Sequence, residues 1–195
     1  MADVDPIACA LFLIVAFVLV GFVQTAWLRS RLSRRFAVPL DGGHTFRGRR
    51  ILGDNKTLRG FLLMVPAAGA VFLLLALLLD SWPVRPAPGL WPLSAGGYGW
   101  LGVGAGFGFM AGELPNSFLK RQLGIPPGAA PPGYLARVFC FVVDRLDSIL
   151  GMLTAVSLLV PTPAATWGYV LVIGPGLHYA FSHLLFLVGV KARSA

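Results

Sequence analysis

The stretch Ile7–Leu28 reads IACALFLIVAFVLVGFVQTAWL and contains no charged residue. An α-helix rises about 1.5 Å per residue, so this run is long enough to cross the roughly 30 Å of hydrocarbon in a bilayer. The preceding residues Met1–Pro6 are acidic where a secretory signal peptide would be basic, and the run is longer than the apolar core of such a peptide. We therefore predict a retained first membrane-spanning helix.

Four further apolar segments follow along the chain. They are roughly Gly60–Leu79, Tyr98–Gly112, Val138–Val160 and Trp167–Val190. Only 12% of all residues are charged and 56% are hydrophobic, whereas a soluble domain carries about 25% charged residues. The apolar residues form blocks without a helical or strand period, which indicates lipid as the solvent. The predicted fold class is all-α: one domain, residues 1–195, forming a polytopic membrane helical bundle of about five transmembrane helices.

The basic residues are distributed unevenly between the connections. The net charge is +8, and most of it lies between the first two segments, between the third and fourth, and at the C-terminus with Lys191 and Arg193. The connection between the second and third segments, on the opposite side of the membrane, has Arg85 as its one basic residue. The positive-inside rule then predicts an external N-terminus, a cytoplasmic C-terminus and a multi-pass protein of the cell membrane. Because the basic residues flank apolar segments, we expect them to meet lipid headgroups, and we expect no nucleic-acid partner.

Two carboxylates interrupt the fourth apolar segment. Asp144 and Asp147 are three residues apart, so on a helix they share a face. A charge inside a membrane helix costs about 2.5–3.5 kcal/mol by insertion scales, so the pair needs partners. The candidate partners are a basic residue such as the adjacent Arg145, in a structural salt bridge, or a metal ion, or both. Carboxylate oxygens suit Mg²⁺, which keeps water ligands and takes phosphate oxygens from its substrate.

Cationic side chains in the neighbouring connections favour a phosphate-bearing substrate. Lys56 and Arg59 lie between the first two segments, and Lys120 and Arg121 lie between the third and fourth. We place all four on loops, where positive charge is ordinary. Next to a metal-binding carboxylate pair, they would hold a triphosphate and neutralise charge during its transfer.

Other features leave alternatives open. The glycine-rich third segment indicates either close helix packing or a floor on which a ligand approaches the backbone. Small residues in the third and fifth segments permit a homodimer without requiring one. His178 and His183 are five residues apart, off the spacing of a helical metal pair, and are expected to face the bundle. There is no GxxxxGK[ST] phosphate loop and no HExxH motif.

Two elements resemble a known family. The run Ser117-Phe118-Leu119-Lys120-Arg121, a Gly/Pro-rich spacer and Asp144-Arg145-Leu146-Asp147 together resemble the signature of phosphatidate cytidylyltransferases. The run Gly53-Asp54-Asn55-Lys56-Thr57-Leu58-Arg59-Gly60 is similar to the first cytoplasmic motif of the small CDP-archaeol synthase branch of that family. Leu58 departs from the branch, which usually has an aromatic residue there.

The resemblance implies a Mg²⁺-dependent reaction of CTP with a membrane lipid phosphate, archaeol-type or phosphatidic acid, that gives a CDP-lipid and pyrophosphate at the cytoplasmic face. It implies catalytic roles for Asp144, Asp147, Lys120 and Lys56. It implies metal binding by Asp144, Asp147 and Glu113, where Gly112-Glu113 matches a Gly-Asp pair. The substrate-binding residues it implies are Asp54, Thr57, Arg59, Asn116, Ser117, Arg121 and Arg145. The first motif would serve the nucleotide or the lipid phosphate.

Two other functions remain open from the sequence. One is a CTP-dependent polyprenol or phytol kinase-like enzyme, which transfers a different phosphoryl group. The other is a non-catalytic membrane transporter or scaffold, in which the intramembrane Asp pair would be an ion or proton site.

Overall fold

The computed structural model describes residues 4–81 and 89–189. Five α-helices make up most of this part of the chain: α1 Pro6–Arg29, α2 Leu58–Ser81, α3 Ala95–Gln122, α4 Tyr134–Leu159 and α5 Ala164–Leu187. The prediction of an all-α bundle of about five helices is confirmed. The expected positions of Arg85, Val190, Lys191 and Arg193 lie outside the described residues.

Helix α3 differs most from its predicted bounds. It begins at Ala95, directly after the cap residue Ser94, whose hydroxyl accepts a hydrogen bond from the backbone N–H of Gly97, and it runs for 28 residues to Gln122. The prediction that Lys120 and Arg121 lie on a loop is therefore wrong, because the helix continues through Pro115. Arg59 is likewise on a helix, in the first turn of α2. A proline inside a membrane helix is tolerated because neighbouring groups satisfy the freed backbone carbonyl.

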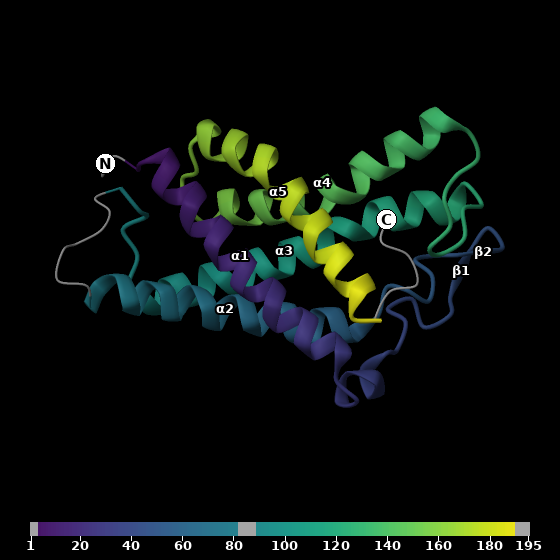
Figure 1. The fold of residues 1–195 in the computed structure, drawn as a ribbon, viewed down its shortest axis with the longest axis horizontal. Coiled ribbons are helices and arrows are strands. Elements are labelled where there is room, and N and C mark those ends of the chain that lie inside the picture. The colour runs from purple at the N-terminus through teal and green to yellow at the C-terminus, as the bar shows by residue number, and fades with distance from the viewer. Residues whose placement is uncertain (1–3, 82–88, 190–195) are drawn as a thin grey trace.

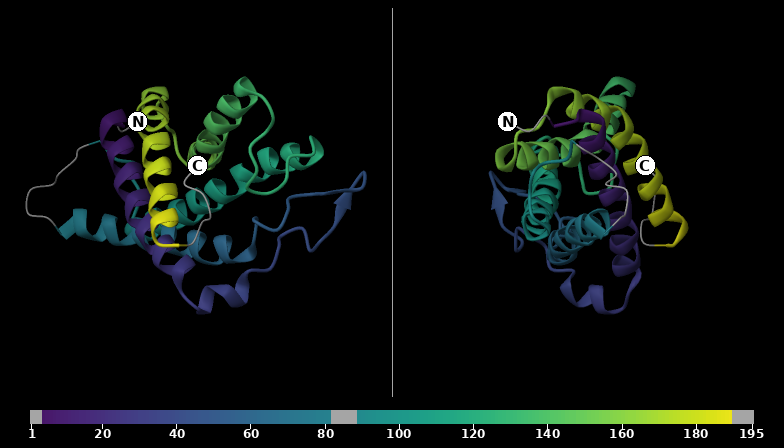
Figure 2. Two further views of the ribbon diagram at one scale, coloured as in Figure 1. Left: turned by 45° about the vertical axis from the view of Figure 1, so that its right-hand side comes forward. Right: turned by 90° about the vertical axis from the view of Figure 1, so that its left-hand side faces the viewer.

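Helices α1, α2 and α5 are each 24 residues long and apolar enough to cross a membrane by length and composition. Helices α3 and α4 are at least as long but carry the charged and amide residues of the cluster described below. In the views of Figures 1 and 2, α3 lies between α2 and α4, and α1 and α5 cross this layer on one side. The fully buried Leu13, Phe72 and Leu153 lie in the core between the two layers.

Glycines set how closely α3 approaches its neighbours. A Cβ at Gly106 would lie 2.9 Å from the Met64 carbonyl oxygen of α2. On the opposite face, a Cβ at Gly108 would lie 2.5 Å from the Gly151 carbonyl oxygen of α4. The close-packing interpretation of the third segment is thus confirmed, because backbones meet where a side chain would keep them apart.

The ends of the helices bring the basic connections to one end of the molecule. The C-terminal ends of α1 and α3 and the N-terminal ends of α2 and α4 lie on the same side in Figure 1. The connection between α1 and α2 contains a 3₁₀ helix, η1 Leu32–Phe36, and a short antiparallel hairpin of β1 Thr45–Phe46 and β2 Arg49–Arg50, with Thr45 opposite Arg50. The hairpin packs against the end of α3, where Gln122 donates to the Arg50 carbonyl oxygen at 3.3 Å.

Candidate active site

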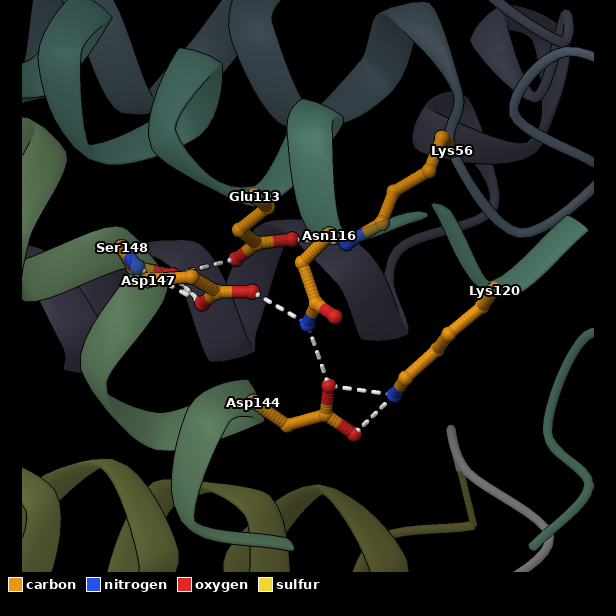
Figure 3. A network of polar contacts seen from close by, with 7 residues as sticks. All are labelled: Lys56, Glu113, Asn116, Lys120, Asp144, Asp147 and Ser148. Carbon is orange, nitrogen blue, oxygen red and sulfur yellow. Dashed lines mark hydrogen bonds and ion pairs between the residues drawn. The ribbon is translucent and has the colours of Figure 1, made fainter. Parts of the chain in front are cut away.

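A network of charged and amide side chains lies between α3 and α4 (Figure 3). Glu113, Asn116 and Lys120 are spaced three and four residues apart, so they share one face of α3. Asp144 and Asp147 share the facing side of α4, as the sequence predicts. The glycine contact between the two helices holds these faces together, because a Cβ at Gly112 would collide with the Asp147 carbonyl oxygen.

Asn116 links the two aspartates. Its amide nitrogen donates to Asp144 Oδ1 at 2.6 Å and to Asp147 Oδ2 at 2.8 Å. Lys120 forms an ion pair with Asp144. One carboxylate oxygen from each aspartate therefore converges on the same point, with cationic and N–H donors around it. The side chains that donate hydrogen bonds to the two aspartates and pair with Asp144 thus come from the neighbouring helix α3.

Glu113 lies on the other side of this network. It forms an ion pair with Lys56, which comes from the connection before α2, and it accepts the Ser148 hydroxyl of α4 at 2.9 Å. Both charged side chains are less than one fifth exposed. The pair thus joins the first cytoplasmic motif to the carboxylate cluster, across three elements that are distant in sequence.

Arg145 is turned away from the aspartates. Its guanidinium lies 3.3 Å from the centre of the Phe141 ring and donates to the Phe141 carbonyl oxygen at 2.7 Å. The ring of Tyr179 on α5 is 5.2 Å from the same guanidinium. The hypothesis of a structural salt bridge with Arg145 is therefore wrong for the described residues, where Lys120 is the cation paired with Asp144. The nearer aromatic rings hold the guanidinium by cation–π attraction.

Asp41 organises the loop that carries Lys56. Its buried carboxylate accepts two bonds from Arg50, at 2.6 and 3.2 Å, and backbone N–H groups of Leu52 and Gly53 at 2.9 and 3.0 Å. The Arg50 guanidinium and these N–H groups hold the pKa of Asp41 well below its ordinary value. No role for Asp41 is predicted from the sequence. The sequence pattern that could have indicated its position is an aspartate followed by two glycines within a basic loop, which is typical of a turn.

Two cavities meet at the Lys56–Glu113 pair. The larger, of about 870 Å³, is the more polar of the two and lies between the ends of α3 and α4 and the proline-rich connection. Asn116, Ser117, Lys120, Arg121, Asp144 and Asp147 line it. The smaller, of about 450 Å³, is mainly apolar and lies between α1, α2, α3 and α5. The residues lining both are Asn55, Lys56, Glu113, His178 and Ser182.

Of the other predicted site residues, Arg121 and Arg145 line the larger cavity, and Thr57 and Arg59 line the smaller one. The Nε atom of Arg145 is buried without a hydrogen-bond partner within the described residues. Arg121 is 7% exposed, and its Nε and Nη1 atoms have no hydrogen-bond partner within residues 4–81 and 89–189. Asp54 is not brought into the cluster: its side chain is 74% exposed and pairs with Arg50 at 2.8 Å. Buried guanidinium atoms without a hydrogen-bond partner are costly, so an anion in the larger cavity would be a suitable partner for Arg121.

The carboxylate pair suits Mg²⁺ by its chemistry. Asp144 and Asp147 converge on one nitrogen of Asn116, and their carboxylate oxygens are hard ligands of the kind Mg²⁺ prefers. No group of three or more His, Cys, Asp or Glu side chains able to hold a metal ion is present in the described ranges. Glu113 is already engaged by Lys56 and Ser148. An ion here would therefore draw its remaining ligands from water and substrate phosphate.

Of the five residues that line both cavities, three were not assigned to the site from the sequence: Asn55, His178 and Ser182. Asn55 lines both cavities and stands inside the quoted motif, between Asp54 and Lys56. His178 of α5 also lines both, with its ring 6.0 Å from that of Phe109. The expectation that both histidines of α5 face the bundle is confirmed for His178 and wrong for His183, whose side chain is exposed. The closeness of His178 to the charged cluster depends on how α5 crosses α3, and no local pattern reveals that.

These features define a class of protein: a polytopic membrane protein with an acid–base cluster between a polar and an apolar cavity. Residues 10–193 match the family described as CarS-like, CDP-archaeol synthase, and the chain belongs to that family. CDP-archaeol synthase of Halobacterium salinarum is 35% identical over 168 residues, 78% of this chain and 81% of its own. That of Methanococcoides burtonii is 33% identical over 162 residues, 78% of this chain and 87% of its own.

A solved structure supports the same relationship. It is described as an intramembrane enzyme for archaeal membrane lipids biosynthesis, and it shares 26% sequence identity with this chain. The match covers 83% of this chain and 90% of that one, with a TM-score of 0.50. The helical membrane architecture is therefore common to both proteins.

Proposed function

We propose that this protein is a CTP-dependent lipid-phosphate cytidylyltransferase of membrane phospholipid biosynthesis, which forms a CDP-lipid and releases pyrophosphate. The observation that carries the proposal is the meeting of a polar and an apolar cavity at Lys56 and Glu113. A nucleotide triphosphate and a lipid phosphate need such a pair of adjoining sites. The CDP-archaeol synthase relatives support an archaeol-type lipid as the substrate.

The polar cavity is proposed to bind CTP. Lys120 and the partnerless guanidinium of Arg121 face this space from the last turn of α3, where they can neutralise a triphosphate. Ser117 lies one turn before Arg121 on the same helix and lines the same cavity. The cavity also has room for the base between α4 and the proline-rich connection.

The apolar cavity is proposed to hold the chains of the lipid phosphate. Lys56, Thr57 and Arg59 form the polar end of this cavity. Its walls come from the apolar faces of α1, α2 and α5. A lipid in this cavity keeps its chains in a hydrocarbon environment while its phosphate reaches Lys56. Lys56 is therefore assigned to the lipid phosphate, and Lys120 and Arg121 to the nucleotide.

The proposed reaction is a substitution at phosphorus. An oxygen of the lipid phosphate forms a bond to the α-phosphorus of CTP, and the bond from that phosphorus to the bridging oxygen of pyrophosphate breaks. Lys56 holds the attacking phosphate, while Lys120 and Arg121 stabilise the charge that develops on the leaving pyrophosphate. Asp144 and Asp147 would hold Mg²⁺, which supplies Lewis-acid stabilisation of phosphate oxygens when bound.

The site is proposed to face the cytoplasm. The basic connections lie at the same end of the bundle as the cluster, and the positive-inside rule assigns such an end to the cytoplasmic side. CTP is soluble there, so the nucleotide can enter the polar cavity without crossing the bilayer.

The test is an assay of purified protein with CTP labelled on its α-phosphate, a lipid phosphate and Mg²⁺. The expected result is a chloroform-soluble label and one pyrophosphate for each CDP-lipid. Asp144→Asn and Asp147→Asn should each reduce turnover by at least 100-fold, and chelation of divalent ions should abolish it. Wild-type turnover in either variant would contradict the metal-site assignment.

The same assay separates the other functions. A polyprenol or phytol kinase-like enzyme would release CDP and leave no cytidine on the lipid. A transporter or scaffold would give neither product. Archaeol phosphate and phosphatidic acid compared side by side would show which lipid is preferred.

A further inference from the structure

The segment that follows α1 combines exposed arginines with exposed apolar side chains. This η1 segment, residues 29–38, runs from the last residue of α1 through η1 to the second residue beyond it. Leu32 is 52% exposed, Phe36 36% and Val38 54%. The exposed basic residues between and beside them are Arg29, Arg31, Arg34 and Arg35. The segment therefore presents positive charge and apolar surface together.

The four arginines are not neutralised by the protein. They form no ion pair with a carboxylate among residues 4–81 and 89–189. The sequence has no Asp or Glu between Asp5 and Asp41, and the Asp41 carboxylate is engaged by Arg50. The η1 segment thus offers its charge to an anion outside the chain.

The η1 segment lies where a membrane-spanning helix ends. η1 packs against α1 and α2, and the Phe36 ring is 6.0 Å from that of Trp27. The Trp27 indole donates to the carbonyl oxygen of Arg59, a residue that lines the smaller cavity. In Figures 1 and 2, η1 lies next to the end of α1, whereas the hairpin of β1 and β2 lies farther out, beside the end of α3. Tryptophan at the end of a span is typical of the membrane–water interface, so we place the segment at the level of the headgroups.

An anionic bilayer surface satisfies both halves of this segment. Guanidinium groups pair with phosphate in a bidentate geometry, and the acyl chains just beneath the headgroups can cover the apolar side chains. A cluster of at least four basic residues beside a membrane span is typical of binding to anionic lipids. A soluble protein partner would match the arginines, but it would have to displace the bilayer from the apolar side chains.

We infer that the η1 segment lies in the plane of the membrane interface and binds the headgroups of anionic phospholipids, with Leu32, Phe36 and Val38 among the acyl chains. The inference goes beyond the proposed function, because none of residues 29–38 lines either of the two cavities described above. One consequence rests on the proposed function. A lipid phosphate is itself an anionic lipid, so the arginines should concentrate it beside Arg59.

The first test measures the depth of the segment without any turnover. Leu32→Cys, in protein that also carries Cys9→Ala and Cys140→Ala, is labelled with an environment-sensitive fluorophore and reconstituted into phosphatidylcholine vesicles with increasing fractions of phosphatidylglycerol. A lipid spin-labelled near its headgroup should quench the label more strongly as the anionic fraction rises. Salt at about 1 M should reverse this gain, because it shortens the Debye length to about 3 Å. Thr45→Cys, exposed on the hairpin, is the matched control and should show no such gain.

The second test removes one charge. Arg35→Gln should raise the phosphatidylglycerol fraction needed for half-maximal quenching by about fivefold. Arg47→Gln makes the same change in charge at an exposed position of the hairpin and should leave that fraction unchanged. In the CDP-lipid assay, Arg35→Gln should raise the KM for lipid phosphate and leave kcat and the KM for CTP at wild-type values.

The outcomes separate the inference from the proposed function. Equal quenching of the labels at positions 32 and 45 would overturn the inference, whatever the activity. If Leu32→Cys fails to fold, as judged by thermal melting in detergent, the same comparison with Val38→Cys decides. An unchanged KM for lipid phosphate in Arg35→Gln would overturn the concentration of substrate alone. Lipid-dependent quenching in a protein that makes no CDP-lipid would overturn the proposed function and support the membrane contact.

Discussion

Gly112 of α3 and Gly151 of α4 touch through their backbones: a Cβ on Gly151 would lie 2.7 Å from the Gly112 Cα atom. The next residue of α3 is Glu113, and Asp147 lies one turn before Gly151 on α4. The glycine contact thus determines the separation of the two faces that carry the cluster. Any side chain at this point must push the helices apart.

Gly151→Ala should therefore impair both stability and activity. Overpacking of this kind typically costs about 1–3 kcal/mol. A displacement of about 1 Å between catalytic groups can cost about 100-fold in rate, so turnover should fall together with the free energy of unfolding. Thermal melting in detergent and the labelled-CTP assay measure the two effects. Gly176→Ala on α5 is the control, because a Cβ there meets no atom within 4 Å; equal effects of both variants would argue against the glycine contact.

The Lys56–Glu113 pair should show strong non-additivity. Lys56→Met or Glu113→Gln alone leaves one charge largely buried without its ion-pair partner, which typically costs about 3–5 kcal/mol. The double variant removes both charges and should recover most of that stability. Its activity should stay low, because Lys56 is assigned to the lipid phosphate. A double-mutant cycle on unfolding free energies tests this, and additive losses would contradict the pairing.

Asp41→Asn should loosen the connection between α1 and α2 at neutral pH. The pKa of the Asp41 carboxyl is lower in the folded protein than in the unfolded chain, where it is about 3.9. The stability gained from the ionised carboxylate is therefore fully present above about pH 4 and is lost as the pH falls toward the pKa of the folded protein. The wild-type loop should therefore become more open to proteolysis only below about pH 4. The Asn variant should be open already at pH 7, since it loses the ion pair with Arg50.

Asp54→Asn serves as the comparison for this loop. Asp54 also contacts Arg50, but its carboxylate is 74% exposed, and exposed ion pairs contribute little. Limited proteolysis or hydrogen exchange of residues 41–57 should then resemble wild type. Equal loosening in both variants would show that Asp41 has no special part in ordering the loop.

Arg145 and Arg121 should respond differently to the same change. Arg145→Lys replaces a guanidinium stacked on Phe141 and should cost about 0.5–2 kcal/mol of stability while changing the KM for CTP less than twofold. Arg121→Lys should instead raise the KM for CTP by about tenfold, because the partnerless guanidinium is assigned to the triphosphate. Steady-state kinetics at saturating lipid phosphate measure both, and a large KM effect at Arg145 would contradict the expected difference between the two arginines.

The sequence by itself determined that the protein is embedded in a membrane, that it has about five helices, and that its charged residues lie mainly at one end of the bundle. These follow from residues within a short window, since hydropathy and helical spacing are local properties. The shared face of Asp144 and Asp147 is of the same kind, as it needs only the helical repeat. The motifs around Lys56 and Lys120 likewise indicated the family before any geometry was known.

Only the tertiary structure decided which side chains meet. Asp144 is adjacent to Arg145 in sequence, yet it pairs with Lys120 and Asn116 of another helix. The η1 segment lies beside the proposed lipid site because Trp27 ties α1 to Arg59. Such contacts depend on where helices cross and how closely they approach. That distance is set by backbone contact between Gly112 and Gly151, which lie on different helices.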